Sequence, residues 1–75
     1  MKVTFDNCLI CDVRKITFED KTYFSLDVYQ DGKLYRVSIP RESVKTFKEA
    51  IGQSVSLDAN MSVFDGKVKF KLVQE

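Results

Sequence analysis

Apolar and polar residues alternate along two pairs of neighbouring segments, and each pair is joined by an Asp-Gly dipeptide. In residues 23–29, Phe24, Leu26 and Val28 alternate with polar or aromatic neighbours, and the alternation resumes after Asp31-Gly32. This pattern around a two-residue turn is typical of a β-hairpin. The turn predicts the cross-strand pairs Tyr29 with Leu34, Val28 with Tyr35, Asp27 with Arg36, Leu26 with Val37, and Phe24 with Ile39.

A second hairpin is predicted around Asp65-Gly66. One strand alternates through Val55, Leu57, Ala59 and Met61, and the other through Val68, Phe70 and Leu72. The turn pairs Met61 with Phe70 and Ala59 with Leu72, so apolar residues again face each other. The opposite face of the last strand then carries Lys67, Lys69 and Lys71.

The segment before the first hairpin predicts one long strand through much of residues 3–18, followed by a polar loop at residues 19–22. Its apolar residues do not keep one phase. The odd-numbered ones are Val3, Phe5, Leu9, Cys11 and Val13, and the even-numbered ones are Ile10, Ile16 and Phe18. A β-bulge would account for the change, because one extra residue reverses the facing of all that follow. A break is expected near Asp6-Asn7, and the sequence leaves the position of the bulge open.

Between the hairpins the period changes from two to that of a helix. Pro40 ends the preceding strand, and Val44, Phe47 and Ile51 occupy one helical face within residues 41–51. Gly52 is suited to ending the helix, which is expected to cap the barrel with Phe47 in the core.

Three strands, a helix and two strands in 75 residues predict a single domain, residues 1–75. The fold expected is mainly β, a five-stranded Greek-key barrel of the oligonucleotide/oligosaccharide-binding (OB) type.

Composition and net charge reduce the number of function classes that we expect for this chain. The net charge is +1, whereas dedicated duplex-DNA binders are usually strongly basic. The sequence has no histidine, no glycine-rich phosphate loop and no paired carboxylates at catalytic spacing, so we expect neither an enzyme nor a cofactor. No run approaches the ~20 apolar residues of a membrane helix, and the N-terminus lacks the apolar core of a secretory signal. A cytoplasmic location without membrane contact is expected.

Cys8 and Cys11 have the spacing of half a zinc ribbon, but the other half is missing. Residues three apart on a strand point to opposite faces, which opposes chelation and pairing. We therefore expect no metal, and at least one buried, apolar thiol in a reducing compartment.

Several short motifs extend over most of the chain. They are Val13-Arg14-Lys15-Ile16-Thr17, Lys21-Thr22-Tyr23-Phe24, Pro40 before a Phe-containing helix, Gly52 before Val55-Ser56-Leu57, and Phe64-Asp65-Gly66-Lys67. With these motifs the chain resembles the nucleic-acid-binding OB domains found beside polymerases, helicases and aminoacyl-tRNA synthetases. Its size and tyrosines are also similar to the small single-stranded-DNA-binding proteins of phages and conjugative mobile elements. It departs from the larger relatives in its tighter Asp31-Gly32 turn.

The resemblance implies that a ligand crosses the outward face of the second and third strands, flanked by the loops after strands one and four. We expect single-stranded nucleic acid, DNA more than RNA, bound with low sequence specificity. Bases would stack on aromatic side chains, and arginine and lysine would hold phosphates. The candidate residues are Arg14, Phe18, Lys21, Tyr23, Tyr29, Leu34, Arg36, Phe64, Lys67 and Lys69.

Other interpretations of the same residues stay open. Tyr29 and Leu34 are equally suited to a homodimer contact or to a partner protein, because tyrosine is enriched at interfaces. Asp27 opposite Arg36 is expected to form a neutral pair that weakens the basic patch. The lysine row of the last strand is also typical of a solvated strand that resists aggregation. The alternative function is therefore a protein-interaction module or accessory subunit of a DNA replication or conjugation complex.

Overall fold

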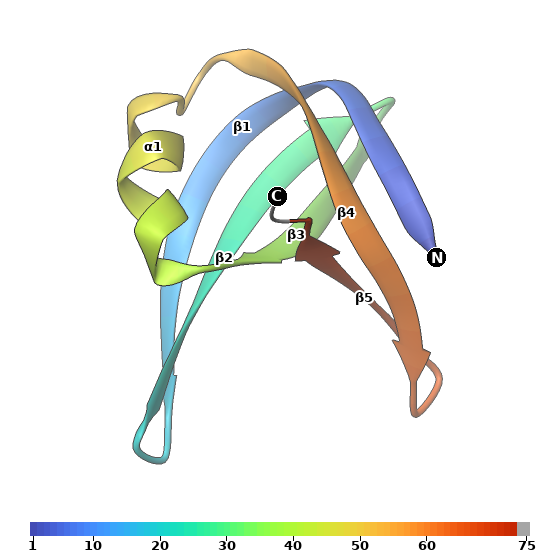
Figure 1. Cartoon of the computed structure of the whole chain (residues 1–75). Coiled ribbons are helices and arrows are strands. Elements are labelled where there is room, and N and C mark those ends of the chain that lie inside the picture. The colour runs from blue at the N-terminus through green and yellow to red at the C-terminus, as the bar shows by residue number, and fades with distance from the viewer. Residues whose placement is uncertain (74–75) are drawn as a thin grey trace.

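Five strands close into a barrel in the computed structural model, which describes residues 1–73 (Figure 1). They are β1 (Lys2–Phe18), β2 (Lys21–Gln30), β3 (Lys33–Ile39), β4 (Ser54–Phe64) and β5 (Lys67–Leu72). Their order is β1-β2-β3-β5-β4, with β4 paired to β1; β3 and β5 run parallel and the other neighbours antiparallel. A short helix, α1 (Val44–Glu49), lies between β3 and β4. The predicted five-stranded, OB-type barrel is confirmed.

Both predicted hairpins have the predicted register. In the first, Tyr29 pairs with Leu34 and Asp27 with Arg36; in the second, Met61 pairs with Phe70. The prediction of a loop over residues 19–22 is wrong, because β2 already begins at Lys21, which pairs with Phe18. A two-residue turn suffices here since Glu19 adopts a left-handed conformation with φ of 55°. The β1–β2 hairpin is therefore longer than its polar residues suggested.

β1 bends through two irregularities, where the sequence predicted one bulge. Its first half pairs with β4 and its second half with β2. The register shifts between Phe5 and Cys8, where Asn7 has a φ of 55°, and again between Ile10 and Asp12. The first shift matches the predicted break at Asp6-Asn7. The second leaves Cys11 exposed and returns the core-facing positions from even, at Cys8 and Ile10, to odd, at Val13. Ile16 and Phe18 face outward without a further bulge.

The helical segment is shorter than predicted. A 3₁₀ turn at Arg41–Ser43 precedes α1, and Gly52 has the expected positive φ, 89°. Val44 and Phe47 pack against the barrel core as predicted, and both remain half-buried. Ile51 is exposed, contrary to prediction, because α1 ends before it and Ala50 takes the core-facing position.

No helix within residues 1–73 has the length and apolar character needed to cross a membrane.

The core contains side chains from every strand, and three aromatic rings connect β1, β3 and β5. The buried apolar residues are Phe5, Cys8, Ile10, Leu26, Val28, Val37, Ile39, Leu57 and Ala59. The ring centroid of Phe5 lies 5.1 Å from that of Tyr35 and 5.3 Å from that of Phe70, and Tyr35 and Phe70 are 5.7 Å apart. These distances are typical of attractive aromatic pairs.

The two cysteines have different environments. Cys8 is fully buried, and its Sγ donates a hydrogen bond to the carbonyl oxygen of Val55 at 3.3 Å. Burial raises the pKa of the Cys8 thiol, so it stays protonated and behaves as an apolar residue. Cys11 is free and exposed at the second bulge of β1. The prediction of at least one buried thiol is confirmed.

Candidate nucleic-acid interface

Two hairpin tips project from the same end of the molecule, at the bottom left and bottom right of Figure 1. Each tip is closed by a phenylalanine opposite a lysine: Phe18 pairs with Lys21, and Phe64 with Lys67. The two phenylalanines are 67% and 71% exposed, so the barrel core does not need them. The sequence named all four residues as candidates, and the structure places them as two matching aromatic–cationic tips.

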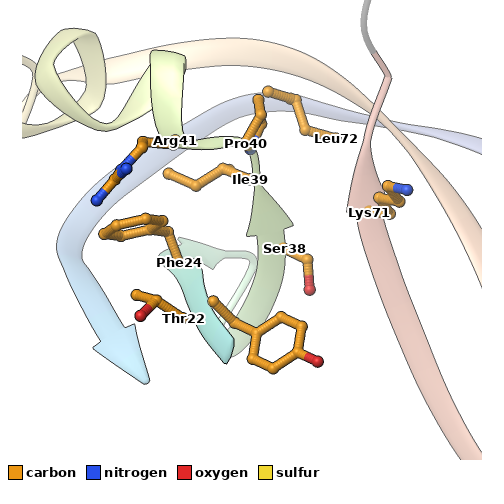
Figure 2. A pocket seen from close by; sticks show the side chains of 9 residues that line it. Thr22, Phe24, Ser38, Ile39, Pro40, Arg41, Lys71 and Leu72 are labelled. Atoms are coloured by element: carbon orange, nitrogen blue, oxygen red, sulfur yellow. The ribbon is translucent and has the colours of Figure 1, made fainter. Parts of the chain in front are cut away.

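A pocket of about 580 Å³ opens beside the β1–β2 hairpin (Figure 2). Its walls come from β2, from the end of β3 with the turn that follows, and from β5. The lining residues are Thr22, Tyr23, Phe24, Ser38, Ile39, Pro40, Arg41, Lys71 and Leu72. Figure 2 shows Ser38 between the β2 side chains and Lys71. Tyr23, a predicted site residue, is therefore exposed and forms part of the wall of this pocket.

A second, shallower depression of about 360 Å³ adjoins the first at Ser38. It is lined by Ile16, Arg36, Ser38, Val68, Lys69 and Phe70. The two depressions share Ser38 as a lining residue, and we refer to them together as the Ser38 groove. Tyr23 of β2 lines the first depression, and Arg36 of β3 and Lys69 of β5 line the adjoining second one.

The Ser38 groove exists because the β3–β5 seam is short. β5 pairs with β3 only through Val37–Phe70 and Ser38–Lys71 in the described residues. The rest of the β4–β5 hairpin diverges from β3 and extends beyond the core (Figure 1). Val68, predicted to face inward, does so past the end of the core and is exposed. Its apolar surface therefore lines the second depression instead of packing inside the barrel.

A buried carboxylate lies at the centre of the outer face of β2. Asp27 and Ser25 were expected on an exposed face, but both are buried. Arg14 Nε lies 2.6 Å from Asp27 Oδ2, and Arg36 Nε lies 3.6 Å from Asp27 Oδ1. The expected Asp27–Arg36 pair is present, but it is not an isolated neutral pair, because Arg14 shares the same carboxylate. The cluster carries an excess positive charge at the edge of the Ser38 groove.

Tyr29 and Leu34 lie near the other end of the β2–β3 hairpin. They are 46% and 63% exposed and lie opposite each other, as predicted. Leu9 of β1 pairs with Tyr29 on its other side and is also exposed, so the three side chains form an apolar row across three strands. Tyr23 and Tyr29 are six positions apart on β2, a separation of roughly 20 Å. The predicted tyrosines therefore belong to two different surfaces.

The lysines of β5 are exposed on its outer face. Lys69 Nζ lies 5.8 Å from the centroid of the Phe64 ring, within the range of a cation–π contact. Lys69 also lines the second depression, and Lys71 lines the first. The row therefore follows one wall of the Ser38 groove.

Sequence reasoning missed Leu9, Ile16 and Arg41 as surface residues next to these candidates. Leu9 and Ile16 were counted in the apolar phases of β1, and only the positions of the two bulges show that they face outward. Arg41 follows Pro40 directly, and its place at the pocket depends on how the chain leaves β3. No local sequence signal marks any of the three.

The side chains around the Ser38 groove are mainly aromatic and cationic. Among residues 1–73 no group of three or more His, Cys, Asp or Glu side chains is placed to hold a metal ion. Aromatic rings, guanidinium groups and ammonium groups surround a polar floor at Ser38. No family model, characterised protein or solved structure matches the chain, so the interpretation of this groove depends on its own geometry.

Proposed function

We propose that the protein binds single-stranded nucleic acid in the Ser38 groove, without strong sequence preference. The observation that carries the proposal is the convergence of Tyr23, Arg36 and Lys69 on one groove between two aromatic-tipped hairpins. Aromatic faces stack on any base, and cations follow the phosphate backbone. DNA is the expected form because of the resemblance to small single-stranded-DNA-binding proteins.

Each part of the surface has a role in this proposal. Bases stack on Tyr23 within the groove and on Phe18 and Phe64 at the tips. Arg14, Arg36 and Lys69 hold phosphates, and Lys21 and Lys67 extend the cationic path to the two tips. Stacking and phosphate contacts do not read base edges, which is why low specificity is expected.

A titration of a fluorescent dT oligomer at two salt concentrations tests the proposal. Binding should weaken as salt rises, with a log–log slope of about −2 if three phosphates are neutralised. A uridine oligomer measured in parallel compares RNA with DNA. Absence of salt-dependent binding to both oligomers at low ionic strength would contradict the proposal.

Tyr23→Ala should weaken oligonucleotide binding about tenfold, because loss of a base–aromatic stack costs about 1–3 kcal/mol. Tyr29→Ala is the matched control, since it removes an equally exposed tyrosine of the same strand outside the groove. It should change affinity by less than about twofold. Equal losses for the two variants would show that the bound strand follows the whole face of β2 instead of the Ser38 groove.

The apolar row of Leu9, Tyr29 and Leu34 favours a second candidate function, self-association. β3 pairs with β5 only at Val37 and Ser38, so residues 33–36 have no ladder partner on that side within the described chain. An exposed apolar row next to an unpaired strand edge is a typical contact surface for a second copy.

Leu34→Lys should abolish any concentration-dependent dimer, because it places a charge in the centre of the apolar row. Sedimentation velocity over a hundredfold concentration range measures the effect. Lys33→Ala, at an exposed position next to Leu34 but on the other face of β3, is the control for a general change of surface charge. A wild-type protein that stays monomeric throughout this range would exclude this candidate function.

A further inference from the structure

Asp27 is a buried charge on the outside of a barrel. Its side chain is 6% exposed, whereas those of Arg14 and Arg36 are 52% and 57% exposed. The arginines come from the strands on either side of β2 and cover the carboxylate. Arg36 is its cross-strand partner on β3, and Arg14 reaches it diagonally from the position opposite Ser25. The outer face of β2 is therefore covered by two side chains that hold one anion beneath them.

The carboxylate binds each arginine through Nε and leaves the outer part of each guanidinium group accessible. Arg14 Nε donates to Oδ2 at 2.6 Å, and Arg36 Nε approaches Oδ1 at 3.6 Å. A guanidinium group has five N–H donors in a planar fork, so contact at Nε alone leaves the terminal nitrogens for another acceptor. Asp27 and its two arginines carry one excess positive charge, which the exposed carboxylate of Asp12, opposite Asp27 on β1, partly offsets. The guanidinium nitrogens that Asp27 does not contact remain donors for a further anion.

The position of the cluster shows which anion it would meet. Arg36 lines the second depression of the Ser38 groove beside Lys69. A strand that crosses this groove carries one phosphate per nucleotide, and phosphate oxygens match the fork of arginine. Arg14 and Arg36 each contact one oxygen of the same Asp27 carboxylate, so Asp27 links the two forks.

We propose that Asp27 is a positioning residue that holds Arg14 and Arg36 as a paired clamp for one phosphodiester group of the bound strand. This inference rests on the proposed nucleic-acid-binding function. Without the carboxylate the two long side chains would repel each other and sample many rotamers, so each would have to be ordered when the ligand binds. The buried acid orders them in advance, and an acidic residue thereby strengthens the binding of a polyanion.

The clamp predicts that removing the acidic charge of Asp27 weakens oligonucleotide binding, although the net charge becomes more positive. Asp27→Asn removes one negative charge, so the net charge rises from +1 to +2. Simple electrostatic attraction predicts tighter binding of an oligonucleotide. The clamp predicts binding about tenfold weaker, the order of loss when a charge-assisted interaction is broken.

Asp12→Asn is the matched control. Asp12 lies next to Asp27 across the β1–β2 ladder but is exposed, and it contacts neither arginine in the described residues. Its substitution causes the same change of net charge, so binding should be unchanged or slightly tighter. Arg36→Lys is a second clamp variant, which keeps the charge and loses the fork; it should weaken binding several-fold and remains informative if Asp27→Asn does not fold.

Three measurements separate the clamp from the proposed function. Thermal unfolding first establishes which variants are folded. The dT titration then compares Asp27→Asn with Asp12→Asn, and Arg36→Lys with wild type. Arginine side-chain NMR spectra of the wild type record whether added pyrophosphate shifts the Nε–Hε signals of Arg14 and Arg36 together.

If folded Asp27→Asn binds the oligomer as tightly as Asp12→Asn, or if Arg36→Lys binds as tightly as wild type, the clamp is wrong and the nucleic-acid function stands. If the wild type binds no oligomer, the nucleic-acid function is wrong and the phosphodiester clamp that rests on it is wrong as well; a joint shift of both arginine signals by pyrophosphate would then show only that the two arginines bind an anion. If neither oligomer nor pyrophosphate binds, both are wrong.

Discussion

Phe5→Ala is expected to destabilise the barrel by about 3–5 kcal/mol, the usual cost of truncating a buried phenylalanine. Phe5 is 4% exposed, and its ring contacts both Tyr35 and Phe70. The loss would be a large fraction of the roughly 5–15 kcal/mol that stabilises a typical domain. Urea unfolding, followed by circular dichroism, measures the change in the free energy of unfolding.

Phe5→Leu and Phe18→Ala are the controls for this prediction. Phe5→Leu keeps most of the buried volume and should cost clearly less than the alanine substitution. Phe18→Ala removes the same ring from an exposed position and should change stability by at most about 0.5 kcal/mol. Equal destabilisation by Phe5→Ala and Phe18→Ala would show that Phe5 does not occupy the core position described above.

The three packed rings of Phe5, Tyr35 and Phe70, hereafter the aromatic trio, matter for function because they support the short β3–β5 pairing. Within residues 1–73, β3 and β5 share only two residue pairs, and the Tyr35 and Phe70 rings meet there against Phe5. Ser38 and Lys71 are one of those two pairs. Loosening the trio would therefore separate the walls of the Ser38 groove, and oligonucleotide binding should fall together with stability.

The two hairpins could be predicted from the sequence because their information is local. Alternation fixes which residues share a face, and a two-residue Asp-Gly turn fixes the register. Tyr29–Leu34 and Met61–Phe70 are consequently paired as predicted. The five-stranded order followed, since two hairpins, a long first strand and an intervening helix favour few arrangements.

β1 could be predicted only in outline. Its broken alternation showed that a bulge was needed, but a pattern does not say which residue is unpaired. The pairing partners decide that: β4 sets the first irregularity, and β2 sets the second at Cys11. Leu9 and Ile16 therefore changed from expected core residues to surface residues.

The burial of Asp27 also depended on information outside its own hairpin. The Asp27–Arg36 pair follows from the turn, whereas Arg14 reaches Asp27 only with the register that β1 adopts after its second irregularity. A carboxylate with one arginine would form a neutral surface pair. A carboxylate that contacts two arginines holds both side chains in place. This arrangement, and its effect on ligand binding, could not be derived before the structure was known.

Simultaneous replacement of Phe18 and Phe64 by alanine is expected to cause the largest loss of binding without a loss of fold. Each base–aromatic stack contributes about 1–3 kcal/mol, so removal of both should weaken binding of a dT oligomer by roughly a hundredfold or more. The oligomer must be long enough to reach both tips. Fluorescence anisotropy at low salt measures the affinity, and the thermal midpoint should stay close to that of wild type because both rings are exposed.

The single variants and Ile51→Ala complete this experiment. Ile51 is an exposed apolar residue just after α1, away from both hairpin tips, so its substitution should leave affinity unchanged. If the strand spans both tips, each single phenylalanine variant weakens a long oligomer, whereas a short oligomer held mainly in the Ser38 groove responds less. Because salt acts on phosphate contacts and not on stacking, the double variant should keep the wild-type salt slope while its affinity falls. A changed slope with little change in affinity at low salt would mean that the tips act through Lys21 and Lys67, and that the two phenylalanines do not stack on bases.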